Sequence, residues 1–369
     1  MRLTLLLITL LLFKAGSINR NTVAAKQNRA SAEQDHFWEL QDSGVNVSLR
    51  GVSAVSDTCC WASGAKGTVI RTTDGGKTWQ SIGLSDTEAA DFRDIHAWDE
   101  STAVIMSAGD VDRLYRTTDG GKSWTIVYEH SDPAAFFDGI SFDQTGKHGW
   151  LMGDPINGKV HLVTTDDAGV TWKPVPEDRL PSVADGVAAF AASGTHLLNP
   201  NSDTLIIGLG GIDRMVTGHA QSSVLMTMTS GNQWQNIAVP MQAGPSSGVF
   251  SITSVDNTTS RLVVVGGDYQ KPEQNTDNVA ISDDSGRSWR RPSMSNPKGF
   301  RSAVVSVAQN DDRPLLITTG PSGTDQSTDQ GESWSSVSET GFHTLSFVSP
   351  GTLWAAGSEG RVARWQLER

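Results

Sequence analysis

The stretch Arg71 to Trp79, RTTDGGKTW, decides the fold, because the chain repeats its pattern. Four similar copies, RTTDGGKSW, TTDDAGVTW, ISDDSGRSW and STDQGESW, end at Trp124, Trp172, Trp289 and Trp334. A sixth copy, TMTSGNQW, ends at Trp234 and carries Thr229 in place of the aspartate. The shared pattern is Ser or Thr, any residue, Asp, any residue, Gly, any residue, a small polar residue and Trp.

Each position of this pattern suits a tight β-hairpin. The aspartate can accept hydrogen bonds from backbone N–H groups of its own turn, and the following glycine, Gly76 in the first copy, supplies a positive φ. The tryptophan opens the next strand and covers the hairpin with a large apolar face. Catalysis needs one site rather than five, so we interpret the aspartates as structural. They are Asp74, Asp119, Asp167, Asp284 and Asp329.

Length, composition and charge favour one repetitive all-β unit. A chain of 369 residues could form two domains, but a repeated motif argues for a single array. The 37 glycines and 14 prolines indicate many short strands joined by tight turns. The net charge of −12 argues against nucleic acid as a partner, because a phosphate backbone requires a basic face.

The N-terminus predicts export from the cytoplasm. Arg2 and the short apolar run at 3–13 resemble a secretory signal peptide, which we place at residues 1–17. An uncleaved membrane anchor is the alternative, because no Ala-x-Ala site is evident. Residues 18–35 are polar and are predicted to form a flexible lead-in. We therefore expect a secreted or periplasmic bacterial protein with no stable membrane span after signal removal.

The sequence offers no evident metal or cofactor site. Cys59 and Cys60 are the only cysteines, and adjacent cysteines are poorly placed to bond each other, so we interpret them as buried strand residues. No paired Cys or His spacing indicates zinc, and no cofactor is expected. The run Gly208 to Gly211, GLGG, is interpreted as a turn between strands.

The spacing of the tryptophans predicts a propeller. Strands are expected at 92–95, 102–108 and 113–117 before the fourth strand begins at Trp124. Successive tryptophans of the repeats lie 45 to 62 residues apart, near the length of a propeller blade. We predict seven four-stranded antiparallel blades over residues 36–369. The strand near Trp38 should pair with the three strands that end near Trp365, which leaves no exposed edge.

The repeats resemble the Asp-box, or bacterial neuraminidase (BNR), repeat. Over residues 36–369 the layout is similar to the photosystem II stability and assembly factor-like family of bacterial propellers. The resemblance implies that the boxes lie on the hairpin between the third and fourth strands, on the face away from the usual ligand site. It implies a binding or assembly role rather than a particular chemistry, and we expect a monomer.

If the boxes mark one face, the starts of the first strands mark the other, near the mouth of the central channel. Aligning the repeats gives one residue per blade, namely Arg50, Arg93, Asp138, Asp185, Ser247, Arg301 and His343. A second set follows the glycine that ends the second strand, namely Asp110, Asp154 and Asp268, with Tyr269 beside the last. The long polar loop 268–278 after them is a candidate for partner contacts.

Two hypotheses account for the arginines of this ring. Arg50, Arg93 and Arg301 could form a cationic pocket that binds a carboxylate or another anionic group through bidentate hydrogen bonds. Alternatively, they pair with Asp94, Asp138 and Asp185 of neighbouring blades and seal the channel.

The sequence favours a non-catalytic scaffold that presents the charged mouth and its loops to a protein or an anionic ligand. The alternative is a glycoside hydrolase of the sialidase type acting on an anionic sugar. A resemblance to sialidases would imply three arginines on the substrate carboxylate and a tyrosine activated by a glutamate, and Tyr269 with nearby Glu273 is the only such pair that we can place on the mouth face. No catalytic residue is therefore assigned.

Overall fold

The computed structural model describes residues 37–84, 87, 89–109, 112–132, 135–212, 220–256, 259–307, 314–348 and 351–366. Within these ranges the chain forms β-strands and two short 3₁₀ turns, η1 (Glu177–Arg179) and η2 (Ser358–Gly360), and no α-helix. None of the helices in the described ranges has the length and apolar character of a membrane span. The predictions for residues 1–17 and 18–35 concern residues outside these ranges.

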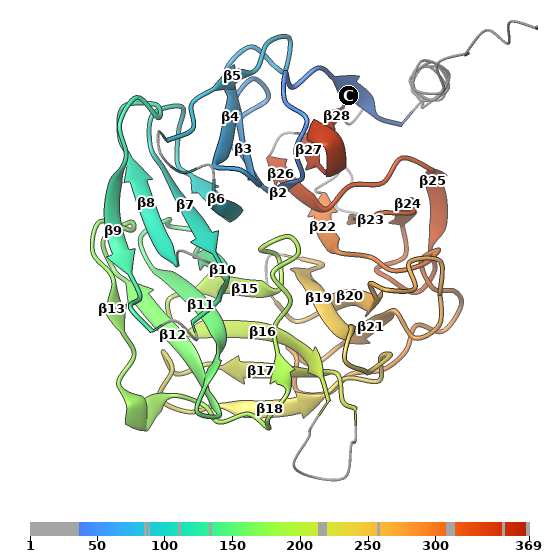
Figure 1. Cartoon of the computed structure of the whole chain (residues 1–369). Coiled ribbons are helices and arrows are strands. Elements are labelled where there is room, and N and C mark those ends of the chain that lie inside the picture. The colour runs from blue at the N-terminus through green and yellow to red at the C-terminus, as the bar shows by residue number, and fades with distance from the viewer. Residues whose placement is uncertain are drawn as a thin grey trace, which may run out of the picture. The chain divides into compact units, whose positions relative to one another are not determined.

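Antiparallel sheets stand around a common centre (Figure 1). The first sheet contains β2 (Leu49–Ala54), β3 (Cys60–Gly64), β4 (Thr68–Thr72) and β5 (Gln80–Ser81). The second contains β6 (Asp91–Ala97), β7 (Ala103–Ala108), β8 (Arg113–Thr117) and β9 (Thr125–Glu129). The third contains β10 (Phe137–Phe142), β11 (Gly149–Ile156), β12 (Lys159–Thr165) and β13 (Lys173–Pro174).

A larger sheet of eight strands follows in the chain. It contains β14 (Val187–Ala188), β15 (Leu197–Asn201), β16 (Thr204–Gly211), β17 (Ser223–Thr227), β18 (Gln235–Ala238), β19 (Ser247–Ser254), β20 (Leu262–Asp268) and β21 (Val279–Ser282). The next sheet contains β22 (Ala303–Val307), β23 (Leu315–Gly320), β24 (Gly323–Ser327) and β25 (Ser335–Ser338). The last contains β26 (Thr344–Val348), β27 (Thr352–Ala356), β28 (Val362–Gln366) and β1 (Glu39–Gln41).

The pairing of β1 with β28 joins the two ends of the described chain. Glu39 lies opposite Arg364, and the ring of Phe37 stacks on Trp365 at 5.1 Å between centroids. The indole N–H of Trp38 donates to Thr324 of the preceding sheet at 3.1 Å. The predicted closure is confirmed, and β28 does not remain an unpaired edge.

The glycines at 208–211 lie inside a strand, so their interpretation as a turn is wrong. They form the end of β16, where this strand meets β19 through the single pair Gly210 and Gly248. A Cβ on Gly208 would lie 2.5 Å from Val249, and one on Gly210 would lie 2.4 Å from the carbonyl oxygen of Ser247. The glycines therefore permit two strands to approach closely rather than to turn.

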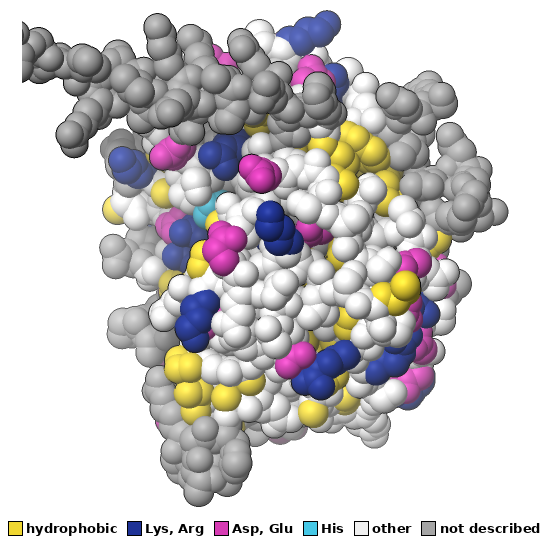
Figure 2. Space-filling view, turned by 90° about the vertical axis from the view of Figure 1, so that its right-hand side faces the viewer, with side chains coloured by type: hydrophobic (Ala, Val, Ile, Leu, Met, Phe, Trp, Pro, Cys, Tyr) yellow, Lys and Arg dark blue, Asp and Glu magenta, His cyan; other side chains and the backbone are white. Residues whose placement is uncertain are grey.

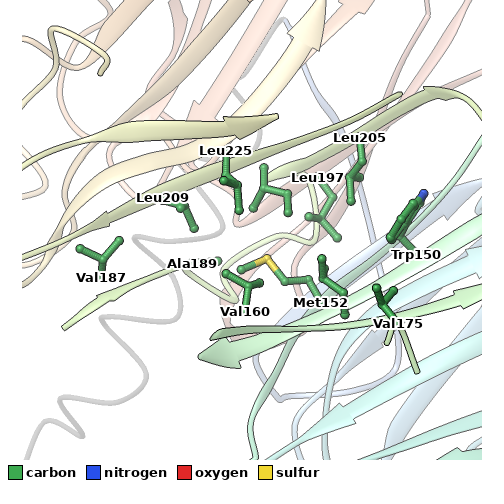
Figure 3. Close-up of a cluster of buried hydrophobic side chains, with 12 residues drawn as sticks. Trp150, Met152, Val160, Val175, Val187, Ala189, Leu197, Leu205, Leu209 and Leu225 are labelled. Carbon is green, nitrogen blue, oxygen red and sulfur yellow. The ribbon is translucent and has the colours of Figure 1, made fainter. Parts of the chain in front are cut away.

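Apolar side chains fill the spaces between neighbouring sheets. Figure 3 shows one such cluster, in which Met152 and Val160 of the third sheet pack against Leu205 and Leu209 of β16. Similar clusters lie between the other neighbouring sheets. Burying a side chain of this size stabilises the fold by about 1.5–3 kcal/mol, so the core is distributed around the ring. Figure 2 shows basic and acidic side chains next to one another on one side of the ring.

The aspartate turns share one set of hydrogen bonds. In the second copy, Asp119 Oδ1 accepts from the Ser123 N–H at 2.9 Å, and Oδ2 accepts from the Ser123 hydroxyl at 2.6 Å. The Thr117 hydroxyl donates to the same carboxylate at 2.9 Å and accepts from the Gly121 N–H at 3.0 Å. The copies at Asp74, Asp167, Asp284 and Asp329 repeat this set. The structural interpretation of these aspartates is confirmed.

The turn without aspartate uses a hydroxyl instead. Thr229 Oγ1 accepts from the Gln233 N–H at 2.9 Å, and Thr227 Oγ1 accepts from the Gly231 N–H at 3.1 Å. The Thr229 hydroxyl therefore replaces the carboxylate's bond to the backbone and also lies 3.4 Å from the Thr227 hydroxyl, while Gln233 lacks the hydroxyl that would donate to a second oxygen.

The strand register places the aspartate turns and the starts of the first strands at opposite ends of a sheet. In the first sheet Leu49 pairs with Gly64, which pairs with Thr68. Thr72, which begins the aspartate turn, pairs instead with Cys60 at the far end of β3. In this sheet the two features therefore lie at opposite ends.

We expect Asp119→Ala to lower the melting temperature at pH 7 by on the order of 2–4 °C, because three hydrogen bonds lose their acceptor. Hydrogen bonds from Ser123, first from its hydroxyl, lower the pKa of Asp119 to about 2. Because the folded pKa lies below the unfolded value, this stabilisation is present above about pH 4 and is lost as the pH falls toward 2.

Thermal melts of the native protein and of Asp119→Ala between pH 7 and pH 2.5 measure this difference in melting temperature. The exposed Asp178 of η1 provides the control substitution Asp178→Ala. A difference in melting temperature that stays constant down to pH 2.5 would contradict the assignment of the effect to the carboxylate.

Candidate functional site

A repeated β-bulge builds the mouth of the ring. Where the first strand of a sheet begins, one extra residue stands out of register with the second strand, which leaves it unpaired and redirects its side chain. The bulged residues are Arg50 in β2, Arg93 in β6, Asp138 in β10 and Phe250 in β19. In the first three sheets these are the residues that the alignment of the repeats gave. In β19 the alignment was wrong, because the equivalent residue is Phe250 rather than Ser247.

The fourth position of the ring holds an inserted segment, residues 189–196, which we call the crossing segment. It connects β14 to β15, and β16 pairs with both strands. The predicted residue for this position, Asp185, instead lies exposed in a turn before β14. The crossing segment therefore takes the place of a single bulged residue. Sequence alignment of the repeats did not detect this insertion.

The crossing segment reaches sheets on several sides of the ring (Figure 1). The carbonyl of Ala191 accepts from Arg93 at 3.2 Å, and the Ser193 hydroxyl donates to the carbonyl of Ser302 at 2.8 Å. Thr344 donates to the carbonyl of Ser193 at 3.1 Å. These bonds join the segment to the sheets of β6, β22 and β26, so it lies across the central channel.

Two arginines share one carboxylate at the mouth. Arg93 Nε lies 3.0 Å and Arg50 Nε lies 3.7 Å from the same oxygen, Oδ2 of Asp91. Both arginine side chains stay about one quarter exposed, and the guanidinium group of Arg93 also lies over the ring of Phe136 at 5.0 Å. Burial, followed by the neighbouring Arg93, lowers the pKa of Arg50. The group thus has more positive than negative charge and is open to solvent.

His343 borders this group as a neutral side chain. Its Nε2 lies 2.7 Å from the Ser358 hydroxyl. Burial first, and then the charges of Arg50 and Arg361, lower its pKa to about 4. At neutral pH the imidazole therefore adds a hydrogen-bonding group rather than a charge.

Three carboxylates lie on the other side of Arg93. Burial raises the pKa of Asp138 well above its usual range, and the carboxylates of Asp154 and Asp112 add to that rise, while Arg93 opposes it. Burial, followed by Asp112, also raises the pKa of Asp154. Asp112 accepts from the N–H groups of Phe137 at 3.2 Å and Gly109 at 3.3 Å, and burial raises its pKa.

We call these residues together the mouth cluster. They are Arg50, Asp91, Arg93, Asp112, Asp138, Asp154 and His343. Sequence reasoning missed Asp91 and Asp112. Asp91 could have been found, because it lies two residues before Arg93 on the same face of a strand. Asp110, which was predicted instead of Asp112, lies outside the described residues.

Arg301 does not take part in the mouth cluster. Its side chain is fully buried, and its Nη2 and Nε lie 2.6 Å and 2.7 Å from Asp325 Oδ2. It also donates to the Ser322 hydroxyl at 3.0 Å. The three-arginine pocket is therefore not formed.

The alternative hypothesis was that carboxylates neutralise the arginines. Carboxylates do lie beside all three arginines, but they are not the ones that the sequence predicted. Asp91 takes the place predicted for Asp94 beside Arg93. Asp94 instead joins β6 to β10, since its two oxygens accept from the N–H groups of Ile95 and Ile140, each at 2.8 Å. The buried Asp94 is thus a structural link between neighbouring sheets.

The remaining predicted residues lie around an aromatic group. Asp268 accepts from Ser246 at 2.7 Å and lies 3.3 Å from Lys271, which leaves it paired. Tyr269 is 48% exposed and lies edge-on to Phe190 and Phe250, whose rings stack at 4.2 Å. Aromatic faces of this kind can pack against apolar parts of a partner.

Chemically, the mouth cluster offers guanidinium groups to an anion and carboxylates to a cation. No group of three or more His, Cys, Asp or Glu side chains in the described ranges is arranged to hold a metal ion. Both cysteines are buried, as predicted, but only Cys60 lies in a strand, whereas Cys59 precedes β3. The cluster is therefore suited to recognition of charged organic groups.

Comparison with known proteins agrees with the fold. Residues 30–130 match the model of a family described as photosynthesis system II assembly factor YCF48. This match covers less than half of the chain, and it agrees with the resemblance that the repeats indicated. No curated protein matches the sequence.

Three solved structures have similar folds. YCF48 bound to D1 peptide is 16% identical, with a TM-score of 0.61 over 90% of this chain and 97% of that chain. YCF48 from Cyanidioschyzon merolae is 15% identical, with a TM-score of 0.59 over 89% and 99%. The WD40 repeats of RRP9 are 10% identical, with a TM-score of 0.60 over 90% and 98%. At these identities the comparison establishes a propeller-like fold.

We expect Gly194→Ala to destabilise the protein, because the crossing segment leaves no room for a Cβ there. Gly194 has φ +73°, and an added Cβ would lie 2.3 Å from the carboxylate of Asp94. Gly44 has nearly the same φ, +71°, with nothing within 4 Å of an added Cβ. Gly194→Ala should therefore lower the free energy of unfolding by about 1–3 kcal/mol more than Gly44→Ala.

Chemical denaturation of the two variants measures this difference. Equal free energies of unfolding would show that the crossing segment is not packed against Asp94.

Proposed function

We propose that this protein is a non-catalytic binding scaffold that holds a segment of a partner protein at the mouth of the ring. One observation carries the proposal: partly exposed Arg50 and Arg93 share Asp91 directly beside the crossing segment. Because the crossing segment occupies the channel, the mouth presents a charged surface on which an extended chain can lie. Two guanidinium groups with one carboxylate between them leave hydrogen-bond donors for an anionic group of the partner.

The similar structures support a protein partner rather than a substrate. One of them is described as YCF48 bound to D1 peptide. The resemblance of the repeats and the family match over residues 30–130 point in the same direction. We therefore propose an assembly role of the photosystem II assembly factor-like kind, with the anionic group of the partner at Arg50 and Arg93.

We also propose that the ring has seven Asp-box blades. The eight-stranded sheet is joined only at Gly210 and Gly248, and strands on each side of this pair lead to a tryptophan turn, at Trp234 and Trp289. Counting its two halves separately gives seven sheets. A crystal structure in which β16 and β19 pair along their whole length would contradict this count.

We expect Arg50→Ala together with Arg93→Ala to reduce partner binding by about tenfold or more, because the anionic group loses both donors. The matched control removes two positive charges from the opposite face, as Lys77→Ala with Lys122→Ala, both exposed residues of aspartate turns. Affinity capture from envelope extracts followed by titration with the captured partner measures the effect.

Equal loss of binding in both double variants would show that net charge, not the mouth, controls binding. Turnover of a fluorogenic sialoside by the purified protein, lost in Tyr269→Phe, would overturn the non-catalytic assignment in favour of the glycosidase alternative. Against that alternative, the trio of arginines that it requires is incomplete because Arg301 is buried against Asp325.

Residues 1–17 are proposed to be a cleaved signal peptide, 18–35 a flexible lead-in, and the mature protein a secreted or periplasmic monomer. Expression of the full chain in a bacterium should yield a periplasmic protein whose N-terminus, determined by mass spectrometry, begins near residue 18. An intact N-terminus in the membrane fraction would instead show that the segment is an uncleaved anchor.

A further inference from the structure

We infer that Asp112, Asp138 and Asp154, which we call the acidic group, bind a cationic side chain, lysine or arginine, of the partner segment. This inference rests on the proposed function, because it assigns a second contact of the same partner. It adds a requirement that the arginines alone do not impose: the partner must carry a positive group next to its anionic one.

The acidic group comes from two neighbouring sheets. Asp112 precedes β8, and two backbone N–H groups hold its carboxylate in place. Asp138 is the bulged residue of β10, and Asp154 lies in β11. Asp112 accepts from the N–H of Phe137, next to Asp138, and the N–H of Asp154 donates to the carbonyl of Phe136, so the three residues lie close together.

The side chain of Asp138 is the feature that points to a ligand. It is only 1% exposed, and within the described ranges its Oδ2 has no hydrogen-bond partner. A buried acceptor without a partner costs about 1–3 kcal/mol, and more when the group is charged. An ammonium or guanidinium group at this position would supply the missing donor and a compensating charge.

Among the residues that the structure describes, neighbouring groups do not already provide that charge. Arg93 is the nearest cation, but its Nε is engaged by Asp91 and its Nη1 by the carbonyl of Ala191. Among the described residues, the carboxylate of Asp154 has neither a hydrogen bond nor an ion pair. The side chain of His130 acts electrostatically on Asp112. Three carboxylates therefore face one shared guanidinium.

A cationic side chain fits this group better than a metal ion. The described residues contain no set of His, Cys, Asp and Glu that could ligate a metal. A lysine or arginine needs only hydrogen-bond acceptors and opposite charge, without a fixed coordination geometry. The sheet of Arg93 lies between those of Arg50 and Asp138, since β6 contacts both β2 and β10, so a partner segment with adjacent positive and negative groups would meet opposite charges on neighbouring sheets.

The test is a selection from a random twelve-residue peptide library on the purified full chain, on Asp154→Asn, and on the exposed control Asp178→Asn. Asp154 is only partly buried, so its amide variant should fold, which thermal melts check. We expect lysine or arginine to be enriched in peptides selected by the native chain and by Asp178→Asn. This enrichment should be lost with Asp154→Asn.

A selected peptide is then compared with the same peptide carrying acetyl-lysine or citrulline in place of its cation. Fluorescence anisotropy should show affinity for the native chain falling about tenfold, and no such difference with Asp154→Asn. Selected peptides that depend on Arg50 and Arg93 but show no preference for lysine or arginine would overturn this inference and leave the proposed function standing. Failure to select any peptide would overturn both.

Discussion

The pairing of β1 with β28 is the constraint on which the rest of the structure depends. Each sheet buries its faces against two neighbours, so the apolar clusters can all be covered only if the last sheet meets the first. The N-terminal strand completes this last sheet, and Phe37 and Trp38 add aromatic contacts to Trp365 and Phe342. Residues from the two ends of the chain therefore share one core, and the first strands are held around a common centre.

Within this closed ring, the bulged residues are available for recognition, whereas the paired residues hold the sheets together. In β2, β6, β10 and β19 the bulge removes one residue from the ladder, and its side chain is then free of the pairing pattern. Different sheets use this freedom differently: Arg50 and Arg93 provide positive charge, Asp138 a buried carboxylate, and Phe250 an aromatic face. The aspartate turns at the opposite end keep the same hydrogen bonds throughout, because there the side chains serve only the turn.

The site residues that could be predicted from the sequence are those that occupy the same position in successive repeats. Arg50, Arg93 and Asp138 were placed correctly because a large apolar residue precedes each of them in the same local pattern. Ser247 and Asp185 were wrong because the sheets at β19 and β14 depart from that pattern, through Phe250 and through the crossing segment. The partner of Arg301 could not be predicted either, since Asp325 lies on a different strand and no feature near it in the sequence marks the pair.

The sequence by itself determined the antiparallel sheets, the aspartate turns, the closing strand and the separation of the two faces. The strands and turns follow from short-range rules, because turn chemistry and strand alternation act over fewer than about ten residues. The closing strand followed instead from the requirement that a ring leaves no exposed edge. Only the tertiary structure decided what fills the centre and which charges meet. Ser193 and Ser302, which join the crossing segment to β22, are 109 residues apart, and contacts at such separations depend on how every intervening sheet packs.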